Sequence, residues 1–358
     1  MLYREAGDFK TSYNTDNQTF PIKFDRYAYW LLLAVAFLVV PFFVNDYWAK
    51  SILVPFLIYV IAALGLNILI GYCGQLSLGT GAFMAVGAYA TFKLTMAFPG
   101  LNVFVVFLMA GFITAAVGVL FGLPSLKIKG FYLAVATLAA QFFLIWLFTR
   151  QGWFFNYSPT GMITMPERQV LGITVTGPTT HAATIYLTCL IFVVGMAWLA
   201  RNLTRGSVGR KWMAIRDMDI AAEIIGVNPL IAKLTAFAVS SFFVGVAGAL
   251  LFGVQLGAAE AGEAFGINKS FLVLFMVIIG GLGSILGSFL GAAFLVVLPV
   301  FLKVLLVDSL GWSSDLARHL EIMIIGALII IVLIAEPHGM AALWRSIKDK
   351  LRLWPFPH

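Results

Sequence analysis

Residues 52–97 read ILVPFLIYVIAALGLNILIGYCGQLSLGTGAFMAVGAYATFKLTMA, and Lys93 is the single charged residue in this stretch. The apolar run over 52–70 is long enough to cross a bilayer, which takes roughly 20 helical residues. A Gly-rich, uncharged segment follows over 71–80, and a second apolar run covers 81–97. The stretch therefore predicts two membrane-spanning helices separated by a break in the helical backbone.

Apolar runs of this kind recur along the whole chain. Hydrophobic residues make up 61% of the 358 residues and charged residues only 11%, too few to cover the surface of a soluble protein. We expect one all-α domain, a polytopic transmembrane helix bundle of about ten spans. The expected spans are 27–44, 52–70, 81–97, 102–123, 131–148, 183–200, 234–256, two within 270–307 that meet at Gly280–Ser284, and 321–335.

The basic residues predict the orientation of these spans. The N-terminal segment is polar and has no apolar core, so it does not resemble a cleavable signal peptide. With ten spans, sixteen of the 23 lysines and arginines fall on the side of the termini, and cytosolic loops carry such an excess. The sequence therefore predicts a cytosolic segment 1–26, a membrane domain 27–340 and a basic cytosolic tail 341–358. The positive charge indicates membrane orientation rather than a nucleic-acid partner.

Small residues recur every four positions in three of the expected spans. On a helix this spacing places them on one face, where another helix backbone can approach closely. We interpret them as packing positions of a tight bundle. The residues are Gly118 and Gly122; Gly245, Ala249 and Gly253; and Gly283, Gly287 and Gly291.

The loop 201–233 is the most charged region between spans and reads RNLTRGSVGRKWMAIRDMDIAAEIIGVNPLIAK. Apolar residues alternate with charged ones from Trp212 to Ile225, which predicts a short amphipathic helix. Gly226 is expected to end this helix, and Pro229 to begin the next element. Acidic residues on the polar face favour docking into a protein groove over binding to lipid.

This loop resembles the coupling loop of branched-chain amino acid ABC permeases, and it is most similar to the M-type subunit. The resemblance implies that the helix inserts into a cleft on a cytosolic ATPase. Small residues would let the helix seat closely, and charged residues would contact the rim. The implied coupling residues are Arg210, Arg216, Asp217, Ala221, Ala222, Glu223 and Gly226.

Further motifs extend the resemblance over roughly residues 50–340. They include Gly74-Gln75-Leu76-Ser77-Leu78-Gly79, Lys129-Gly130 with Thr137-Leu138, Gly280-Gly281-Leu282-Gly283-Ser284, and Pro337 with Gly339. The implied partners are a homologous permease, two cytosolic ATPases that bind ATP and Mg²⁺, a periplasmic binding protein and membrane lipid. The implied location is the bacterial inner membrane.

Polar residues inside apolar spans usually face a bundle interior or a water-filled cavity. We take Gly74, Gln75, Ser77, Thr137 and Gln141 as candidates for the substrate path. The alternative is that their side chains only bond neighbouring helices. The family often has a Gly-Glu pair where this chain has Gln141-Phe142, which favours a neutral or apolar solute. Branched-chain or other apolar amino acids, amides, urea and small organic or aromatic acids all stay open.

Catalytic and metal-binding patterns do not occur in the sequence. There is no paired His/carboxylate spacing for a metal, no nucleophile elbow and no P-loop, so neither an enzyme nor a cofactor bound by this chain is expected. The alternative function is a secondary transporter or channel that needs no ATPase. Ion coupling would require ionisable residues within the spans, and the spans lack a convincing set.

Overall fold

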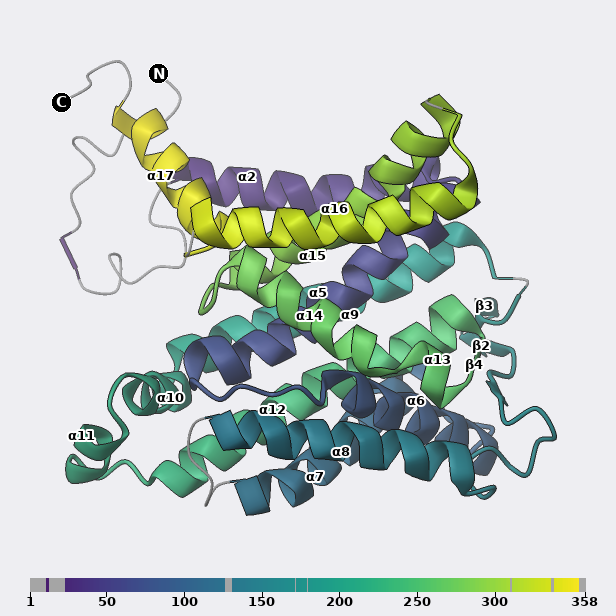
Figure 1. Ribbon diagram of the computed structural model, residues 1–358, viewed down its shortest axis with the longest axis horizontal. Helices are drawn as coiled ribbons and strands as arrows, with labels where there is room; N and C mark the ends of the chain where they lie inside the picture. The colour runs from purple at the N-terminus through teal and green to yellow at the C-terminus, as the bar shows by residue number, and fades with distance from the viewer. Residues whose placement is uncertain are drawn as a thin grey trace.

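The computed structural model describes residues 11–12, 23–125, 131–170, 172–178, 180–309, 311–335 and 338–353. Within these ranges the chain is mostly helical, and eight helices are long and apolar enough to cross a membrane (Figure 1). Short π-helical turns extend several of them. The eight are α2 (Lys23–Ala34) with η1 (Val35–Val39) and α3 (Val40–Phe43); α4 (Asp46–Trp48) with η2 (Ala49–Leu53), α5 (Val54–Asn67) and η3 (Ile68–Tyr72); α7 (Val103–Ser125); α8 (Phe131–Arg150); α9 (Ala182–Arg205); α12 (Pro229–Leu250) with η4 (Leu251–Leu256); α13 (Ala261–Ala264) with α14 (Ile267–Gly280); and α15 (Ile285–Lys303) with η5 (Val304–Ser309).

Two further helices occupy the remaining predicted spans. α6 (Thr80–Ala97) contains Lys93 and many small residues, and the apolar part of α16 (Ser314–Ala335) is confined to Ile322–Val332. Helices thus lie at all ten predicted places in the described residues. The count of ten crossings and the cytosolic side of the termini stay predictions.

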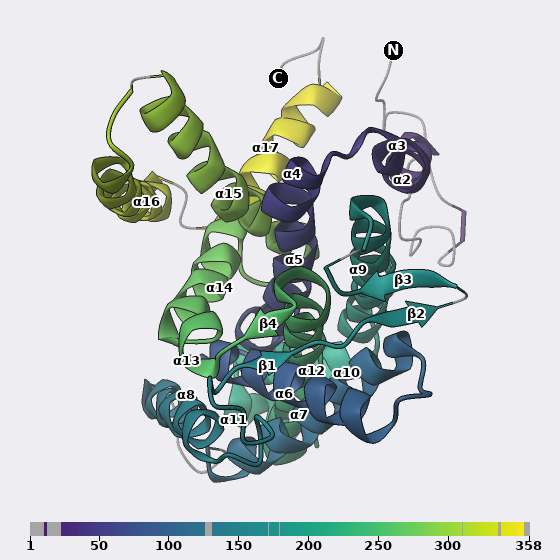
Figure 2. The same ribbon diagram turned by 90° about the vertical axis from the view of Figure 1, so that its right-hand side faces the viewer.

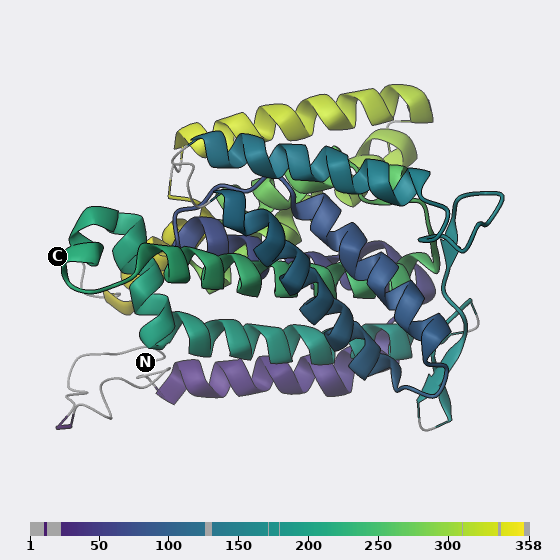
Figure 3. The same ribbon diagram turned by 90° about the horizontal axis from the view of Figure 1, so that it is seen from below.

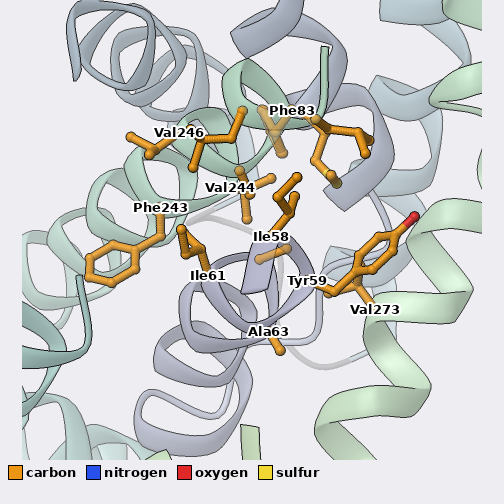
Figure 4. Close-up of a cluster of buried hydrophobic side chains, with 14 of the residues drawn as sticks. Ile58, Tyr59, Ile61, Ala63, Phe83, Phe243, Val244, Val246 and Val273 are labelled. Atoms are coloured by element: carbon orange, nitrogen blue, oxygen red, sulfur yellow. The ribbon is translucent and has the colours of Figure 1, made fainter. Parts of the chain in front are cut away.

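Helices α5 and α12 form the centre of the bundle. In each, 83% of the apolar window is buried within the chain. Figure 4 shows Ile58 and Ile61 of α5 meeting Phe243 and Val244 of α12, with Phe83 of α6 completing the cluster. A helix that is hydrophobic on all sides is expected at such a central position.

Glycines let α12 approach its neighbours closely, as the four-residue spacing predicts. A methyl group added at Gly65 of α5 would lie 2.7 Å from Phe243 Cβ, and one added at Gly253 would lie 2.7 Å from Phe107 Cε1. At Gly245 it would meet Thr114, and at Gly118 it would meet Ser241. Backbone contact of this kind stabilises helix pairs in lipid, where apolar burial supplies little driving force.

The periphery is formed by α2 and α16, which Figure 2 places on opposite flanks. None of the apolar window of the first span is buried within the chain. Tyr186 of α9 donates a hydrogen bond to the carbonyl of Ala36 at 3.1 Å and so attaches this span to the bundle. Both peripheral helices expose large apolar side chains, which suits contact with lipid or with another membrane subunit.

The two ends of the bundle differ in character (Figures 1 and 3). One end carries α10 (Ser207–Asp217), α11 (Asp219–Ile224), α17 (Met340–Leu353) and the start of α2. Lys348 of α17 and Asp25 of α2 form an ion pair there, 2.8 Å between Nζ and Oδ2. The ordered helix α17 was not predicted within the basic tail. Most of segment 1–26, the motif residues Lys129 and Gly130, and Pro337 lie outside the described residues.

The other end carries the loops after α8 and α12, and here the all-α expectation was wrong in detail. β1 (Ile163–Thr164) pairs with β4 (Ala258–Ala259), and β2 (Arg168–Val170) pairs with β3 (Ile173–Thr176), both antiparallel. Backbone groups in these loops need partners once the chain leaves its helices, and short strand pairs supply them. The expected single loop over 149–180 is therefore partly ordered as β-structure.

Candidate functional site

The loop predicted to couple the chain to a partner forms two helices rather than one. α10 ends at Asp217, and Met218 takes an extended conformation with φ −156° before α11 begins. Gly226, at φ +89°, follows the end of α11, as predicted. The side chain of Asn228 then accepts hydrogen bonds from the N–H groups of Leu230 and Ile231 and caps α12, with Pro229 in its first turn.

The inner face of this helix pair packs against the chain itself. Trp212 is fully buried, and its Nε1–H donates to Thr235 Oγ1 at 3.1 Å. Ile215 is 5% exposed and Ala222 only 2% exposed. The small size of Ala222 thus serves packing within the chain, and a partner subunit has no access to it in this arrangement.

The outer face of α11 is apolar and exposed. Met218, Ile220, Ile224 and Ile225 are 70%, 69%, 80% and 76% exposed. Five other predicted coupling residues on the α10–α11 pair and its flanks are also exposed: Arg210, Asp217, Ala221, Glu223 and Gly226. An exposed apolar patch rimmed by polar residues is typical of a protein-docking surface.

Arg216 points in the opposite direction from the predicted rim contact. Its Nη1 donates to the carbonyl oxygen of Gly71 at 2.8 Å, at the end of η3, and its Nε lies 2.8 Å from Asp217 Oδ1. A cation at the end of a helix also interacts favourably with its unpaired carbonyl groups. Gly74 packs on the same side chain, since an added Cβ would lie 3.0 Å from Arg216 Cγ. Arg216 therefore joins α10 to the segment after α5.

Asn67 connects this point to the turn between α14 and α15. Its Nδ2 donates to Ser284 O at 2.8 Å and to Ser288 Oγ at 2.9 Å, and its Oδ1 accepts from Gly283 N–H at 2.9 Å. The side chain is 1% exposed. We call Asn67, Gly71, Arg216, Gly283 and Ser284 the junction. The junction connects both glycine-rich breaks of the sequence, residues 71–80 and 280–284, to the α10–α11 pair.

Beyond the junction the chain has no regular secondary structure from Cys73 to Gly79, and it crosses to the start of α6 as a drawn-out segment (Figure 1) that we call the extended segment. Side chains from α8 and α14 hold this segment and the start of α6. Thr137 Oγ1 accepts from Leu78 N–H at 2.9 Å, and Gln141 Oε1 accepts from Ala82 N–H at 2.6 Å. Ser270 Oγ accepts from Gly81 N–H at 2.7 Å, so two amide groups of the first turn of α6 are already satisfied.

Thr137 and Gln141 are therefore bonded within the chain. Thr137 also donates to Ala134 O, and Gln141 Nε2 donates to Phe265 O at 3.0 Å. To contact a solute they would have to give up these bonds. Their positions favour a role in holding the extended segment in place.

Gln75 and Ser77 differ from them. Gln75 is 5% exposed, and its Oε1 has no hydrogen-bond partner among the residues that the structure describes. Ser77 Oγ only accepts a long bond of 3.4 Å from Gly79 N–H. Thr80 Oγ1, at the start of α6, is likewise buried without a partner. Buried polar atoms are costly to leave unpaired, so unpaired atoms on an extended segment identify a candidate solute site.

Gly74, Gln75 and Ser77 therefore stay predicted substrate-path residues; the sequence marked Asn67 only as a polar residue within an apolar span and did not single out Ser270. The sequence signal for these two residues was a single polar side chain, the amide of Asn67 or the hydroxyl of Ser270, within an apolar run. Their partners lie 217 and 189 residues away along the chain, respectively. No group of three or more His, Cys, Asp or Glu side chains that would hold a metal occurs in the described residues.

Comparison with known proteins identifies the family. The profile described as "Branched-chain amino acid transport system / permease component" matches residues 49–333, which contain both breaks, the junction and the α10–α11 pair. The chain belongs to this permease family. The resemblance stated from the sequence motifs is confirmed, and the protein is a multi-pass inner-membrane permease subunit.

Two groups of relatives illustrate the range of this permease family. The chain is 32% identical to the high-affinity branched-chain amino acid transport system permease protein LivM of Salmonella typhimurium and of Escherichia coli, over 338 residues covering 88% of this chain and 74% of each relative. It is 26% identical to the autoinducer 2 import system permease protein LsrC of Shigella flexneri, over 67% of this chain and 64% of that protein. No solved structure matches the chain.

Proposed function

We propose that this permease forms one half of the translocation path of an ABC importer. A homologous permease would form the other half, two cytosolic ATPases would bind ATP and Mg²⁺, and a periplasmic binding protein would deliver the solute. The observation that carries the proposal is the exposed apolar face of α11 on a helix pair whose inner face reaches the junction. Such a helix fits the groove-docking mode of recognition.

The junction supplies a route for the mechanical coupling. Movement of α10 would act through Arg216 on Gly71 and Gly74 and, across Asn67, on the α14–α15 turn. Both glycine-rich breaks would then move together when the ATPases close. Rigid-body motion at a few hinge points is the usual form of such transitions.

The interior favours a neutral or zwitterionic solute. Every buried polar side chain in the described residues is uncharged, so nothing there would pair with a net charge on the solute or couple transport to an ion. We propose Gln75 and Ser77 as solute contacts and Thr137 and Gln141 as the residues that position them. A branched-chain or other apolar amino acid fits this lining, in keeping with the transport systems named for the LivM relatives.

Co-purification of ATPase subunits with the detergent-solubilised native complex tests the proposal. Ile224→Glu places a charge on the exposed face of α11 and should reduce the recovered ATPase at least tenfold, as expected for loss of a central apolar anchor. The control is Ile173→Glu, which makes the same change at a 57% exposed residue of the opposite end. It should leave the recovery unchanged.

Two outcomes would contradict the proposal. If a transport-competent complex never contains an ATPase, the alternative of an ATPase-independent transporter or channel takes its place. If Ile224→Glu and Ile173→Glu behave alike, the ATPase docks somewhere other than α11.

A further inference from the structure

The C-terminal helix α17 has a surface that the proposed function does not use. It begins just beyond α16 and lies outside the residues that match the family. Apolar side chains recur along it at helical spacing, at Met340, Leu343, Trp344 and Ile347. Met340 packs against the core, whereas the last three are 45%, 51% and 42% exposed, so the described residues leave this outer part of the strip largely uncovered.

Basic side chains flank the strip. At 3.6 residues per turn, Lys350 lies beside one edge of the strip and Lys348 beside the other. Arg345 and Lys350 are exposed, whereas Lys348 reaches Asp25 at the start of α2. An apolar face bordered by lysines is the pattern of helices that lie in the membrane surface, and Arg345 lies on the opposite, polar face. The α11 surface differs, because acidic residues border its apolar face.

Two contacts hold α17 at the level where the spans leave the membrane. The first is the ion pair between Lys348 and Asp25, which lies at the start of the first candidate span. The second is at Gly339, where an added Cβ would lie within 2.5 Å of Gly281 Cα in the α14–α15 turn. Figures 1 and 2 show α17 turning away from the direction of α16 rather than continuing it. The helix is thus placed to run along the surface.

We propose that α17 is an in-plane membrane-surface helix that binds anionic phospholipid headgroups of the inner leaflet. Leu343, Trp344 and Ile347 would insert at the boundary between headgroups and acyl chains. Lys350, beside the strip, would contact the phosphates, where each basic residue near an anionic surface strengthens binding about fivefold.

This surface is connected to the junction. Gly281 packs against Gly339 and Ala341 at the start of α17, and two residues later Gly283 bonds Asn67 and approaches Arg216. Lipid bound to α17 would therefore hold the α14–α15 turn in place. Transport should therefore depend on anionic lipid. This consequence rests on the proposed function, whereas the binding of lipid to α17 does not depend on it.

An environment-sensitive fluorophore on Ile347→Cys tests the proposal in the full purified complex. Cys73 and Cys189 are buried, which limits labelling elsewhere. The complex is compared in nanodiscs of phosphatidylcholine alone and in nanodiscs with an equal amount of phosphatidylglycerol. The probe should shift to shorter wavelength and resist an aqueous quencher only when phosphatidylglycerol is present. Lys350→Gln should weaken this phosphatidylglycerol response about fivefold.

Asp349→Asn is the matched control, because it removes a charge of the opposite sign from the same helix. It should preserve or strengthen the response to phosphatidylglycerol. A probe that is equally shielded in both lipids would overturn the preference for anionic headgroups. A probe that stays aqueous in both, and becomes shielded only when an ATPase is bound, would overturn the lipid assignment in favour of a protein partner.

Discussion

The two glycine-rich breaks, 71–80 and 280–284, look alike in sequence but take different forms. The second is a tight turn in which Gly280 and Gly287 lie backbone against backbone, and Asn67 satisfies Gly283 and Ser284. The first continues as the irregular extended segment from Cys73 to Gly79, in which the buried amide oxygen of Gln75 has no partner among the described residues. The second break is closely packed and bonded through Asn67, while the first contains a buried polar atom with no partner among the described residues.

The comparison shows that two glycine-rich segments of similar composition can differ in role: one is a packed turn, and the other is a candidate solute site. Buried irregular backbone is stable only where protein or water satisfies its polar groups. In the α14–α15 turn, Asn67 bonds Gly283 and Ser284, and the glycines pack backbone against backbone. The turn can therefore move as a rigid unit. The extended segment meets this requirement only in part. Its buried Gln75 Oε1 has no partner among the described residues and is available to bind a solute. The following predictions act on one break or the other.

The largest effect is expected for Gly280→Val in the packed turn. The added side chain would overlap the backbone of Gly287 and Gly291, which cannot move aside. We expect a loss of roughly 3 kcal/mol or more of stability and little recovery of folded complex. Size-exclusion profiles and thermal unfolding in detergent measure this. Gly326→Val in α16, where an added Cβ meets nothing within 4 Å, is the control and should unfold like the wild type.

Arg216→Gln tests whether Arg216 couples ATP hydrolysis to transport without being needed for ATPase binding. The variant loses the charge-assisted bond to Gly71 but leaves the exposed face of α11 intact. We expect the ATPases to stay bound and active, while transport per ATP hydrolysed falls about tenfold or more, as for loss of a 1.5–3 kcal/mol charged hydrogen bond. Lys211→Gln removes an equal charge at an exposed residue of the same helix that is outside the predicted coupling set, and it should keep the transport ratio. Equal ratios in both variants would remove Arg216 from the coupling route.

Gln141→Glu tests how the extended run is held. A carboxylate still accepts from Ala82 N–H and Ser270, but it cannot donate to Phe265 O. The buried carbonyl then loses its partner, at a cost of roughly 1–3 kcal/mol, and burial of the charge adds to it. A lower unfolding midpoint is expected, whereas Gln151→Glu in the exposed loop after α8 should have none of this effect. An unchanged midpoint would show that Gln141 does not hold α6.

The smallest change in stability is expected for Gln75→Leu. This substitution removes a buried acceptor that has no partner, so stability should stay within about 1 kcal/mol of wild type or rise. The apparent KM for the transported solute should nevertheless increase, because a polar contact is lost. Uptake assays and unfolding curves on the same preparation measure both. A drop in stability without a change in KM would make Gln75 a structural residue.

Local signals predicted much of this architecture. Apolar runs located the helices, Gly280–Ser284 marked the turn between α14 and α15, and Asn228-Pro229 marked the start of α12. The break at Met218 was missed because methionine carries no helix-breaking signal. The inward reach of Arg216 was missed because its partner Gly71 is 145 residues away, and no local pattern encodes that distance.

The bond between Asn67 and Ser284 also has a consequence for how the chain is made. The ribosome must add 217 more residues after Asn67 before Ser284 exists, which takes roughly 10 to 40 s at about 5–20 residues per second. During that time the first half of the protein is already entering the membrane with a bare amide. Biogenesis therefore requires the early helices to stay beside the insertion machinery, or in contact with water, until the later half arrives.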